Sequence, residues 1–375
     1  MGVAMVARVG IPTFEQESVL TGRWRVRGLA GFGILEHHMA IRCRGIPIVM
    51  TITRSQRLAI HFFALAAVCV IVLTPSLAGS QRSPATAPPE HVDETLQNQM
   101  NTYARHHRGK VSLFAKQLRT GRTVALNPDV PVNTASVIKL PIMLEAMHQV
   151  KEGRVSFNDM LPLRKEDQVS GSGVLLLFHT PAEINFETAI VLMITQSDNT
   201  AANLVLAHVG RENVNRRLQT MGLQSTMSIR PISRPKEGDQ SPELKPFGIG
   251  RTTAREMAAV LESIERCDLA DQKLCARMVD ILQHQFWRNC IPHYLEDADT
   301  TEVASHVANK TGSLDHVRND VGIVYTKNGP IVISAFTYEN VDTSWTPENE
   351  GELLIARMAK TIVDGWAPDG LGSEK

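Results

Sequence analysis

Three short motifs in this chain combine serine with lysine in a way that suits attack on a carbonyl carbon. The first is S-x-x-K at Ser136 and Lys139, inside a pattern typical of a helix. Because residues three apart lie on one helix face, the two side chains are expected to point the same way. A serine hydroxyl becomes a good nucleophile when a base removes its proton, and a lysine acts as that base where burial lowers its pKa. By itself the motif also fits a helix start followed by a surface lysine.

The second motif, Ser197-Asp198-Asn199, interrupts the apolar stretch MITQSDNTAANL at 193–204. Polar side chains in such a stretch need hydrogen-bond partners, because unpaired polar groups are costly to bury. We predict that Ser197 relays a proton to a leaving nitrogen and that Asn199 binds the substrate amide. The alternative is an ordinary turn between helices, with Asp198 capping the second one.

The third motif is Lys-Thr-Gly-Ser at 310–313, at the end of a predicted strand. A strand that carries glycine lets a substrate lie against the backbone. The Ser313 amide is predicted to form an oxyanion hole with the Ser136 amide, and Lys310 to place positive charge beside the substrate. Thr311 is predicted to contact the substrate as well. The alternative is a strand that runs into a simple turn.

The order of the motifs carries more information than any one of them. Ser197 follows Ser136 by 61 residues (197−136=61), and Lys310 follows Ser197 by 113 (310−197=113). This trio in this order is a signature of class A β-lactamases and penicillin-binding proteins. Over roughly residues 95–366 the chain resembles the class A β-lactamase and related serine hydrolase family. Further matching stretches are SDNTAANL at 197–204, NKTGS at 309–313 and NDVGIV at 319–324.

The resemblance implies a role for each motif residue. By that resemblance, Ser136 would be the acylating serine and Lys139 its proton partner. Ser197 would be the proton shuttle, Asn199 a substrate ligand and Lys310 the electrostatic anchor. Arg318 falls near the place where some relatives bind the substrate carboxylate with an arginine. The SGSG segment at 170–173 would lie in the loop that walls the site.

The carboxylate that a class A β-lactamase needs for its second step is harder to place. The family pattern is Glu-x-x-Leu-Asn, and its glutamate activates the water that cleaves the acyl ester. Here the matching segment is SPELK at 241–245, with serine at the glutamate position. Glu243 is one candidate, whereas spacing back from Thr252-Thr253 gives Glu237 or Asp239. No residue meets both criteria, and each carboxylate also fits a solvated loop.

Three functions follow from these motifs. The leading one is a β-lactamase-type hydrolase that opens the β-lactam amide through a seryl ester. Because the loop glutamate is altered, the second is a D,D-peptidase that acts on peptidoglycan stem peptides. The third is a non-catalytic cell-wall binding module, which the complete trio disfavours. The expected ligand is a small β-lactam or a cell-wall peptide. No cofactor or metal is implied, since the 13 histidines include no H-E-x-x-H motif.

Strands near both ends of the chain are expected to bring the motifs together. Alternating patterns predict strands at 111–118, 123–126, 305–310, 320–326 and 331–337. Helical patterns cover 90–107, 135–151, 185–207, 253–266, 271–286 and 351–366. This order predicts an α+β fold of the β-lactamase type, in which both chain ends build an antiparallel sheet with flanking helices and the remaining helices form a second lobe.

The first 90 residues are expected to lie outside this domain, which we place at 91–370. Arg54, Arg57 and the apolar run LAIHFFALAAVCVIVL at 58–73, followed by Ser76-Leu77-Ala78, predict a signal peptide at 50–78 cleaved after Ala78. An uncleaved membrane anchor is the alternative. Residues 1–49 are predicted to be a gene-call extension before an initiator at Met50, or else a genuine long leader. Residues 79–90 are expected to be a linker. The protein is thus expected to be periplasmic or extracellular.

The cysteines and the charge balance set further limits. Cys267 and Cys275 are eight residues apart (275−267=8) and an exported protein permits a disulfide between them, with Cys290 left over. Three buried thiols are the alternative. Of the 375 residues, 39 are basic and 39 acidic, so the formal charge is zero and nothing favours a nucleic-acid partner. A monomer is expected.

Overall fold

The computed structural model of the chain describes residues 37–43, 46–52, 88–234, 241–296 and 305–372. It divides into two units, Met1–Pro84 and Ala85–Lys375. In the first unit, β1 (His37–Cys43) and β2 (Ile46–Ile52) pair antiparallel, with His37 opposite Ile52. The predicted extension, signal peptide and linker lie almost entirely outside the described residues, so they stay predictions.

The second unit is built on a sheet to which both halves of the chain contribute. In the part of the chain that the structure describes, this sheet has six strands in the order β11-β12-β13-β4-β5-β3. The bounds are β3 His91–Val92, β4 Lys110–Gln117, β5 Arg122–Leu126, β11 Val307–Leu314, β12 Val317–Val324 and β13 Ile331–Tyr338. The seam between early and late strands is β4 against β13, from Ile331 opposite Gln117 to Tyr338 opposite Lys110. All these pairs are antiparallel except β3 with β5.

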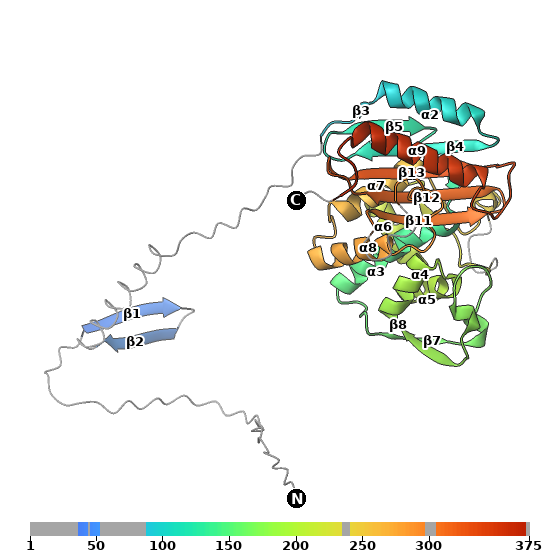
Figure 1. The fold of residues 1–375 in the computed structure, drawn as a ribbon. Helices are drawn as coiled ribbons and strands as arrows, with labels where there is room; N and C mark the ends of the chain where they lie inside the picture. Colours follow the sequence, from blue (N-terminus) through green and yellow to red (C-terminus); the bar gives the residue numbers. More distant parts are fainter. Residues whose placement is uncertain (1–36, 44–45, 53–87, 235–240, 297–304, 373–375) are drawn as a thin grey trace, which may run out of the picture. The chain divides into compact units, whose positions relative to one another are not determined.

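Helices cover both faces of the sheet, and this explains why β12 and β13 are buried along almost their whole length. On one face, α2 (Glu94–His106) packs on β5 and α9 (Glu350–Trp366) packs on β12 and β13 (Figure 1). On the other face, α7 (Ala254–Glu265) contacts β4, β12 and β13. The apolar side chains of the sheet therefore divide between two cores, one on each side.

The remaining helices form the predicted second lobe (Figure 1), so the α+β fold is confirmed. Its members are α3 (Lys139–Lys151), α4 (Phe186–Thr195), α5 (Asn199–Val209), α6 (Arg211–Thr220) and α8 (Gln272–Gln283). Smaller elements complete it: η1 Ala135–Ile138, η2 Lys165–Asp167, η3 Leu175–Leu177, η4 Lys245–Phe247, and the strands β6 Val132–Asn133, β7 Met160–Leu163, β8 Ala182–Asn185, β9 Met227–Ser228 and β10 Gly250–Thr252.

Two expectations about individual elements were wrong, and one helix was not predicted. The single helix predicted at 185–207 is two helices, because Ser197 has a left-handed φ of 52° and Asp198 starts α5 by accepting a hydrogen bond from the Ala201 amide. The 310–313 motif does not end its strand but lies inside β11. Helix α6 was not predicted, since its ten residues, RENVNRRLQT, bury only two side chains, Val214 and Leu218.

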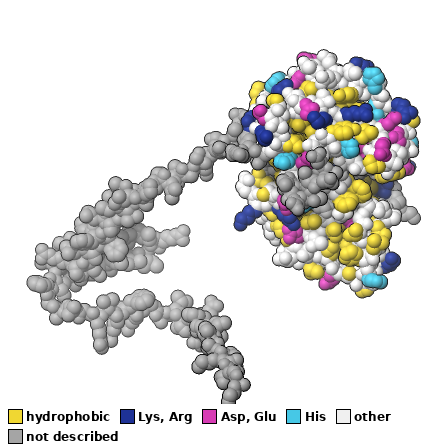
Figure 2. All heavy atoms as spheres, viewed as in Figure 1, with side chains coloured by type: hydrophobic (Ala, Val, Ile, Leu, Met, Phe, Trp, Pro, Cys, Tyr) yellow, Lys and Arg dark blue, Asp and Glu magenta, His cyan; other side chains and the backbone are white. Residues whose placement is uncertain are grey.

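The visible surface agrees with the balanced composition. Figure 2 shows positive and negative side chains interspersed on this face, with hydrophobic side chains gathered over the helical lobe. Exposed large hydrophobic residues of that lobe include Met160, Leu177 and Phe178. None of the helices in the described ranges has the length and apolarity needed to cross a membrane.

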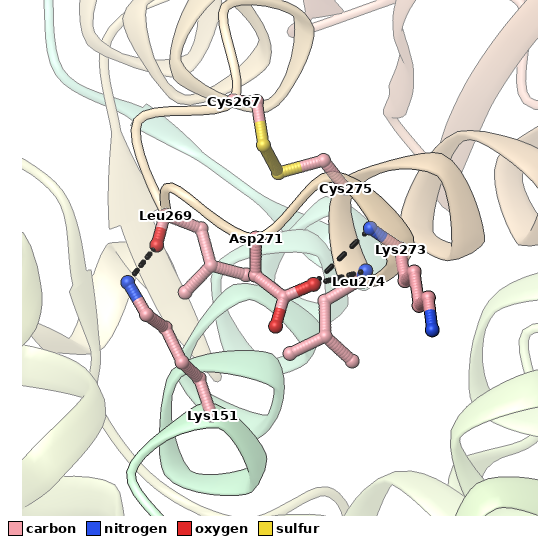
Figure 3. The surroundings of a disulfide bond; sticks show 7 residues. All are labelled: Lys151, Cys267, Leu269, Asp271, Lys273, Leu274 and Cys275. Atoms are coloured by element: carbon pink, nitrogen blue, oxygen red, sulfur yellow. Dashed lines mark hydrogen bonds between the residues drawn. A yellow bond between two sulfur atoms is a disulfide. The ribbon is translucent and has the colours of Figure 1, made fainter. Parts of the chain in front are cut away.

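Cys267 and Cys275 form a disulfide, which decides between the two alternatives that the sequence left open, and it links the end of α7 to α8 (Figure 3). Its Cα atoms are 5.5 Å apart. Within the loop, Asp271 caps α8 by accepting hydrogen bonds from the Lys273 and Leu274 amides, both at 3.1 Å. The Lys151 ammonium donates to the Leu269 carbonyl, so the loop is also tied to α3. Cys290 is buried and is not part of a disulfide.

We expect the double variant Cys267→Ala/Cys275→Ala to fold but to lose about 2–3 kcal/mol of unfolding free energy, the entropy that a closed loop of this length removes from the unfolded chain. Urea denaturation followed by circular dichroism measures the loss. Wild-type protein under reducing conditions should match the variant. A loss below about 0.5 kcal/mol in both would contradict a structural role for this bond.

Candidate active site

The nucleophile candidate, Ser136, lies in η1, directly before α3. A 3₁₀ turn places residues i and i+3 almost in line, so Ser136 and Lys139 share one side of this turn. The preceding residue, Ala135, has a left-handed φ of 43°, and its amide donates to Asn133 Oδ1 at 2.8 Å. Asn319 on β12 donates to the Asn133 and Thr134 carbonyls at 2.9 and 3.1 Å. The sheet thus holds the strained segment that presents Ser136.

The Lys139 ammonium group is completely buried and reaches the second motif. Its Nζ lies 2.6 Å from the Ser197 carbonyl oxygen, 3.2 Å from Ser197 Oγ and 2.8 Å from Asn199 Oδ1. The first motif and the second therefore meet through one amine, as predicted. Asn199 in turn donates to the Ser170 carbonyl at 3.0 Å, which ties it to the SGSG segment.

Lys310 approaches the same hydroxyl from β11. Its Nζ donates to Ser197 Oγ at 3.0 Å and to the Thr311 carbonyl at 2.7 Å. The side chain is fully buried, like that of Lys139. Ser197 Oγ is consequently shared by two lysines that lie 171 residues apart in the chain (310−139=171).

Burial sets the protonation of both lysines. The pKa of Lys139 is held well below its usual value, first because burial penalises the charged form and second because Lys310 is nearby. Burial also lowers the pKa of Lys310 to about 7, and Asp320 opposes this effect. Asp320 itself is buried, accepts both hydrogen bonds of the Asn309 amide group at 2.9 and 3.1 Å, and has a pKa raised to about 7, mainly by burial. A neutral Lys139 beside a chargeable Lys310 gives the site a base and a cation.

Glycine at 312 lets β11 come close to the nucleophile. A Cβ atom there would lie 2.8 Å from the Thr134 carbonyl oxygen and 2.9 Å from the Ser136 nitrogen. Contacts this short are not tolerated between backbone and side chain, so a larger residue would push the strand away from η1. The approach brings the 310–313 motif beside the Ser136 amide, as the predicted oxyanion hole requires.

A cavity of about 580 Å³ joins these elements. The predicted site residues that line it are Ser136, Ser197, Asn199, Thr311 and Ser313, and Gly171 and Ser172 of the predicted wall line it too. Ser172 Oγ donates to the Ser197 carbonyl at 2.9 Å, which fixes the wall to the second motif. Within the described ranges, no group of three or more His, Cys, Asp or Glu side chains could hold a metal.

Lys139 and Lys310 do not line this cavity but contact Ser197, which does. Two other predicted residues are brought neither to the cavity nor to Ser197. Arg318 does not line it: the guanidinium is fully buried and donates to the carbonyls of Leu314, Val317 and Ser344. Glu243 does not line it either. It is exposed, because the neighbouring Leu244 turns inward and is buried. Glu237 and Asp239 lie outside the described residues.

The structure adds lining residues that the sequence analysis missed. Trp287 and Asn289 line the cavity from the α8–β11 connection, Leu314 from β11, Trp345 from the β13–α9 connection and Glu352 from the start of α9. Arg230 lines it from the loop between β9 and β10. These residues belong to no short motif, so only the predicted proximity of late elements to the sheet offered a signal for them.

A sheet built from both chain ends and a serine beside two buried lysines define a protein of the β-lactamase-like class. The model of the β-lactamase enzyme family matches residues 95–366, and the chain belongs to that family. It is 24% identical to a β-lactamase of Bacillus licheniformis over 311 residues, covering 81% of this chain and 96% of the relative. It is 23% identical over 288 residues to the β-lactamase regulatory protein BlaB of Streptomyces cacaoi, covering 68% of this chain and 91% of that protein.

Solved structures agree on the fold. PBP-A superimposes with a TM-score of 0.64 at 24% identity, covering 75% of this chain and 98% of PBP-A. The β-lactamase of Sphaerobacter thermophilus gives a TM-score of 0.63 at 27% identity, covering 73% of this chain and 97% of the other. The fold is therefore common to β-lactamases and to PBP-A.

The electrostatic effect of Asp320 on Lys310 leads to a prediction about titration. Asp320→Asn removes the negative charge that raises the pKa of Lys310, so this pKa should fall below about 7 and the ammonium should lose its proton at lower pH. Nitrogen NMR of the Lys310 amine across neutral pH measures the midpoint. Asp315→Asn, at an exposed position in the β11–β12 turn, is the control and should leave it unchanged. A wild-type midpoint near the ordinary lysine value of about 10.4 would contradict this account.

Proposed function

We propose that this protein is a serine hydrolase that opens the amide bond of a β-lactam through an ester on Ser136. The observation that carries the proposal is the convergence of Lys139 and Lys310 on Ser197 Oγ, beside a cavity that Ser136 also lines. In this arrangement the neutral Lys139 amine can accept the proton of the Ser136 hydroxyl, and Ser197 Oγ can pass a proton to the leaving nitrogen of the substrate. The Lys310 ammonium supplies positive charge beside Ser197.

The first step forms the ester. Ser136 Oγ attacks the carbonyl carbon while its proton passes to the neutral Lys139 amine, whose lowered pKa makes it a base. The developing oxyanion is stabilised by the Ser136 and Ser313 amides. The carbon–nitrogen bond then breaks, and the leaving nitrogen takes a proton from Ser197 Oγ, which regains one from Lys139. Atoms and charge balance, and the product is a seryl ester with an opened ring.

The second step decides between two functions. Water must attack the ester, and Ser136 must leave with a proton, which requires a base near that water. Of the described residues in the β9–β10 loop, 229–234 and 241–249, none that lines the cavity is a carboxylate. This observation supports the second candidate, a D,D-peptidase whose β-lactam ester is long-lived. Glu237 and Asp239 remain predicted bases for the first candidate.

A non-catalytic role has some support from similarity to a protein named as a β-lactamase regulatory protein. The buried lysines argue against it here. Burying two ammonium groups is costly, and a pure binding module gains nothing from a neutral amine beside a hydroxyl. We therefore favour catalysis.

We also propose that the protein acts outside the cytoplasm. The disulfide between Cys267 and Cys275 supports this location, because such bonds persist in oxidising compartments. The substrates proposed above, β-lactams and cell-wall peptides, occur in the same place.

Penicillin G should acylate the wild-type domain, and the adduct should be absent in Ser136→Ala, because the proposed mechanism makes Ser136 Oγ the nucleophile that forms the ester. Intact-protein mass spectrometry over time detects the adduct. Ser156→Ala, at an exposed serine beyond α3, is the matched control and should acylate normally. Rapid decay with turnover supports a β-lactamase, whereas a persistent adduct with release of D-alanine from peptides supports the peptidase. If the wild-type protein forms no adduct, both candidate functions are refuted.

Glu243→Gln should change the decay rate of this adduct by less than about twofold, because the carboxylate is exposed and does not line the cavity. Once acylation is stopped, the mass of the remaining adduct measured over time gives its decay rate. Asp129→Asn, at another exposed loop carboxylate, sets the scale of a neutral change. A slowing of tenfold or more for Glu243→Gln alone would restore Glu243 as the deacylating base.

A further inference from the structure

Two tryptophans of the cavity wall present large aromatic surfaces to solvent. The side chains of Trp345 and Trp287 are 66% and 43% exposed, although aromatic rings of this size are largely buried in most proteins. They come from separate connections, Trp345 between β13 and α9 and Trp287 between α8 and β11. Both line the cavity that Ser136 also lines, so the two exposed rings border one hollow. Exposed apolar surface gathered at a cavity indicates a binding site.

Trp345 lies at the end of β11 that contributes to the predicted oxyanion hole. Its ring centre is 4.6 Å from the Arg318 guanidinium. Arg318 is opposite Ser313 in the β11–β12 pair and donates to the carbonyl of the next residue, Leu314. The same guanidinium donates to the carbonyl of Ser344, which directly precedes Trp345. The ring and its backbone are therefore both fixed beside the Ser313 end of the third motif.

Trp287 lies on the side of the cavity where the leaving nitrogen is expected. The preceding residue, Phe286, donates its amide proton to the Thr195 carbonyl at 3.0 Å, two residues before Ser197. The Phe286 ring meets the Trp287 ring edge to face, with centroids 5.4 Å apart. Since Ser197 is the residue proposed to protonate the leaving nitrogen, Trp287 borders the leaving-group side of the site.

A buried ion pair connects the two segments and cancels the charge beneath them. Glu352 Oε1 lies 3.2 Å from Arg318 Nε. Burial raises the pKa of Glu352, whereas Arg318 and a hydrogen bond with Asn289, two residues after Trp287, lower it. The guanidinium that lies over Trp345 already uses the attraction between a cation and the ring, so a second cation would gain little on the exposed face. This part of the wall therefore favours an uncharged ligand group.

We propose that Trp287 and Trp345 form a subsite for an uncharged apolar or aryl group on the leaving-group side of the substrate. Such a group gains from leaving water and from stacking on the rings. Because the contacts described above already hold both connections, little conformational entropy is lost on binding. The inference rests on the proposed function for the direction of the reaction, and it gives the two tryptophans a role in selecting the substrate.

The test uses two cephalosporins that share the same acyl side chain and carry either a styryl or a methyl group at C3. This group belongs to the fragment that holds the leaving nitrogen, and neither version is expelled. The readout is the ratio of the two second-order rates of Ser136 acylation. Wild type should prefer the styryl compound, and Trp345→Ala and Trp287→Ala should each lower the ratio about 3- to 10-fold, the loss expected for one aromatic contact. The intrinsic reactivity of each compound is the same for every variant, so it cancels.

Three further variants and compounds sharpen this test. Trp345→Phe keeps an aromatic face and should retain most of the preference. Phe178→Ala removes an exposed aromatic ring that does not line the cavity and should leave the ratio unchanged. A styryl group that carries a trimethylammonium should react no faster than styryl itself. A faster reaction would overturn the assignment to an uncharged group, and an unchanged ratio in both tryptophan-to-alanine variants would overturn the subsite.

A second measurement separates this inference from the proposed function. Calorimetry gives the affinity of Ser136→Ala for both cephalosporins, with and without Trp287→Ala, so no chemistry intervenes. A styryl preference that Trp287→Ala abolishes supports the subsite even if wild type forms no ester, an outcome that would refute only the proposed function. Trp345→Ala also uncovers Arg318, and Trp287→Ala, on the other connection, tests the subsite without that change. Unchanged melting temperatures confirm that the variants are folded.

Discussion

Two buried lysine side chains share the hydroxyl of Ser197, and the rest of the site follows from that contact. Two ammonium ions so close together in a medium of low polarity repel each other strongly. The repulsion is relieved when Lys139 is neutral and Lys310 keeps its proton with the help of Asp320. Ser197 Oγ then accepts a hydrogen bond from the Lys310 ammonium and can donate its own proton to the neutral Lys139 amine. A base and a cation thereby result from two residues of the same type.

Local strain serves this arrangement. Ala135, which directly precedes the first motif, and Ser197, which begins the second motif, both have left-handed backbone conformations. Each is held by neighbours: Asn133 and Asn319 on one side, and the Asp198 cap with the Ser172 wall on the other. A side chain on a regular helix projects outward at fixed intervals, whereas these breaks turn Ser136 and Ser197 toward a common point.

The fold class and most site residues were predictable because short motifs fix which residues lie together within one turn or strand. The i, i+3 spacing predicted Ser136 and Lys139, and the family resemblance predicted their meeting with Lys310. The fate of Arg318 was not predictable, since it depends on Ser344 and Glu352, far along the chain. Arg230, which lines the cavity from the loop between β9 and β10, was missed because it belongs to no short motif.

The seam between β4 and β13 has a consequence for the order of events during synthesis. The strand that completes the sheet beside residues 110–117 is made only when the ribosome reaches residues 331–338. Lys310 and its supporting strands likewise come late, long after Ser136 and Lys139. A growing chain thus carries its nucleophile for most of its synthesis without the cation that would complete the site. Reactivity is a property of the finished chain, and a truncated product lacks it altogether.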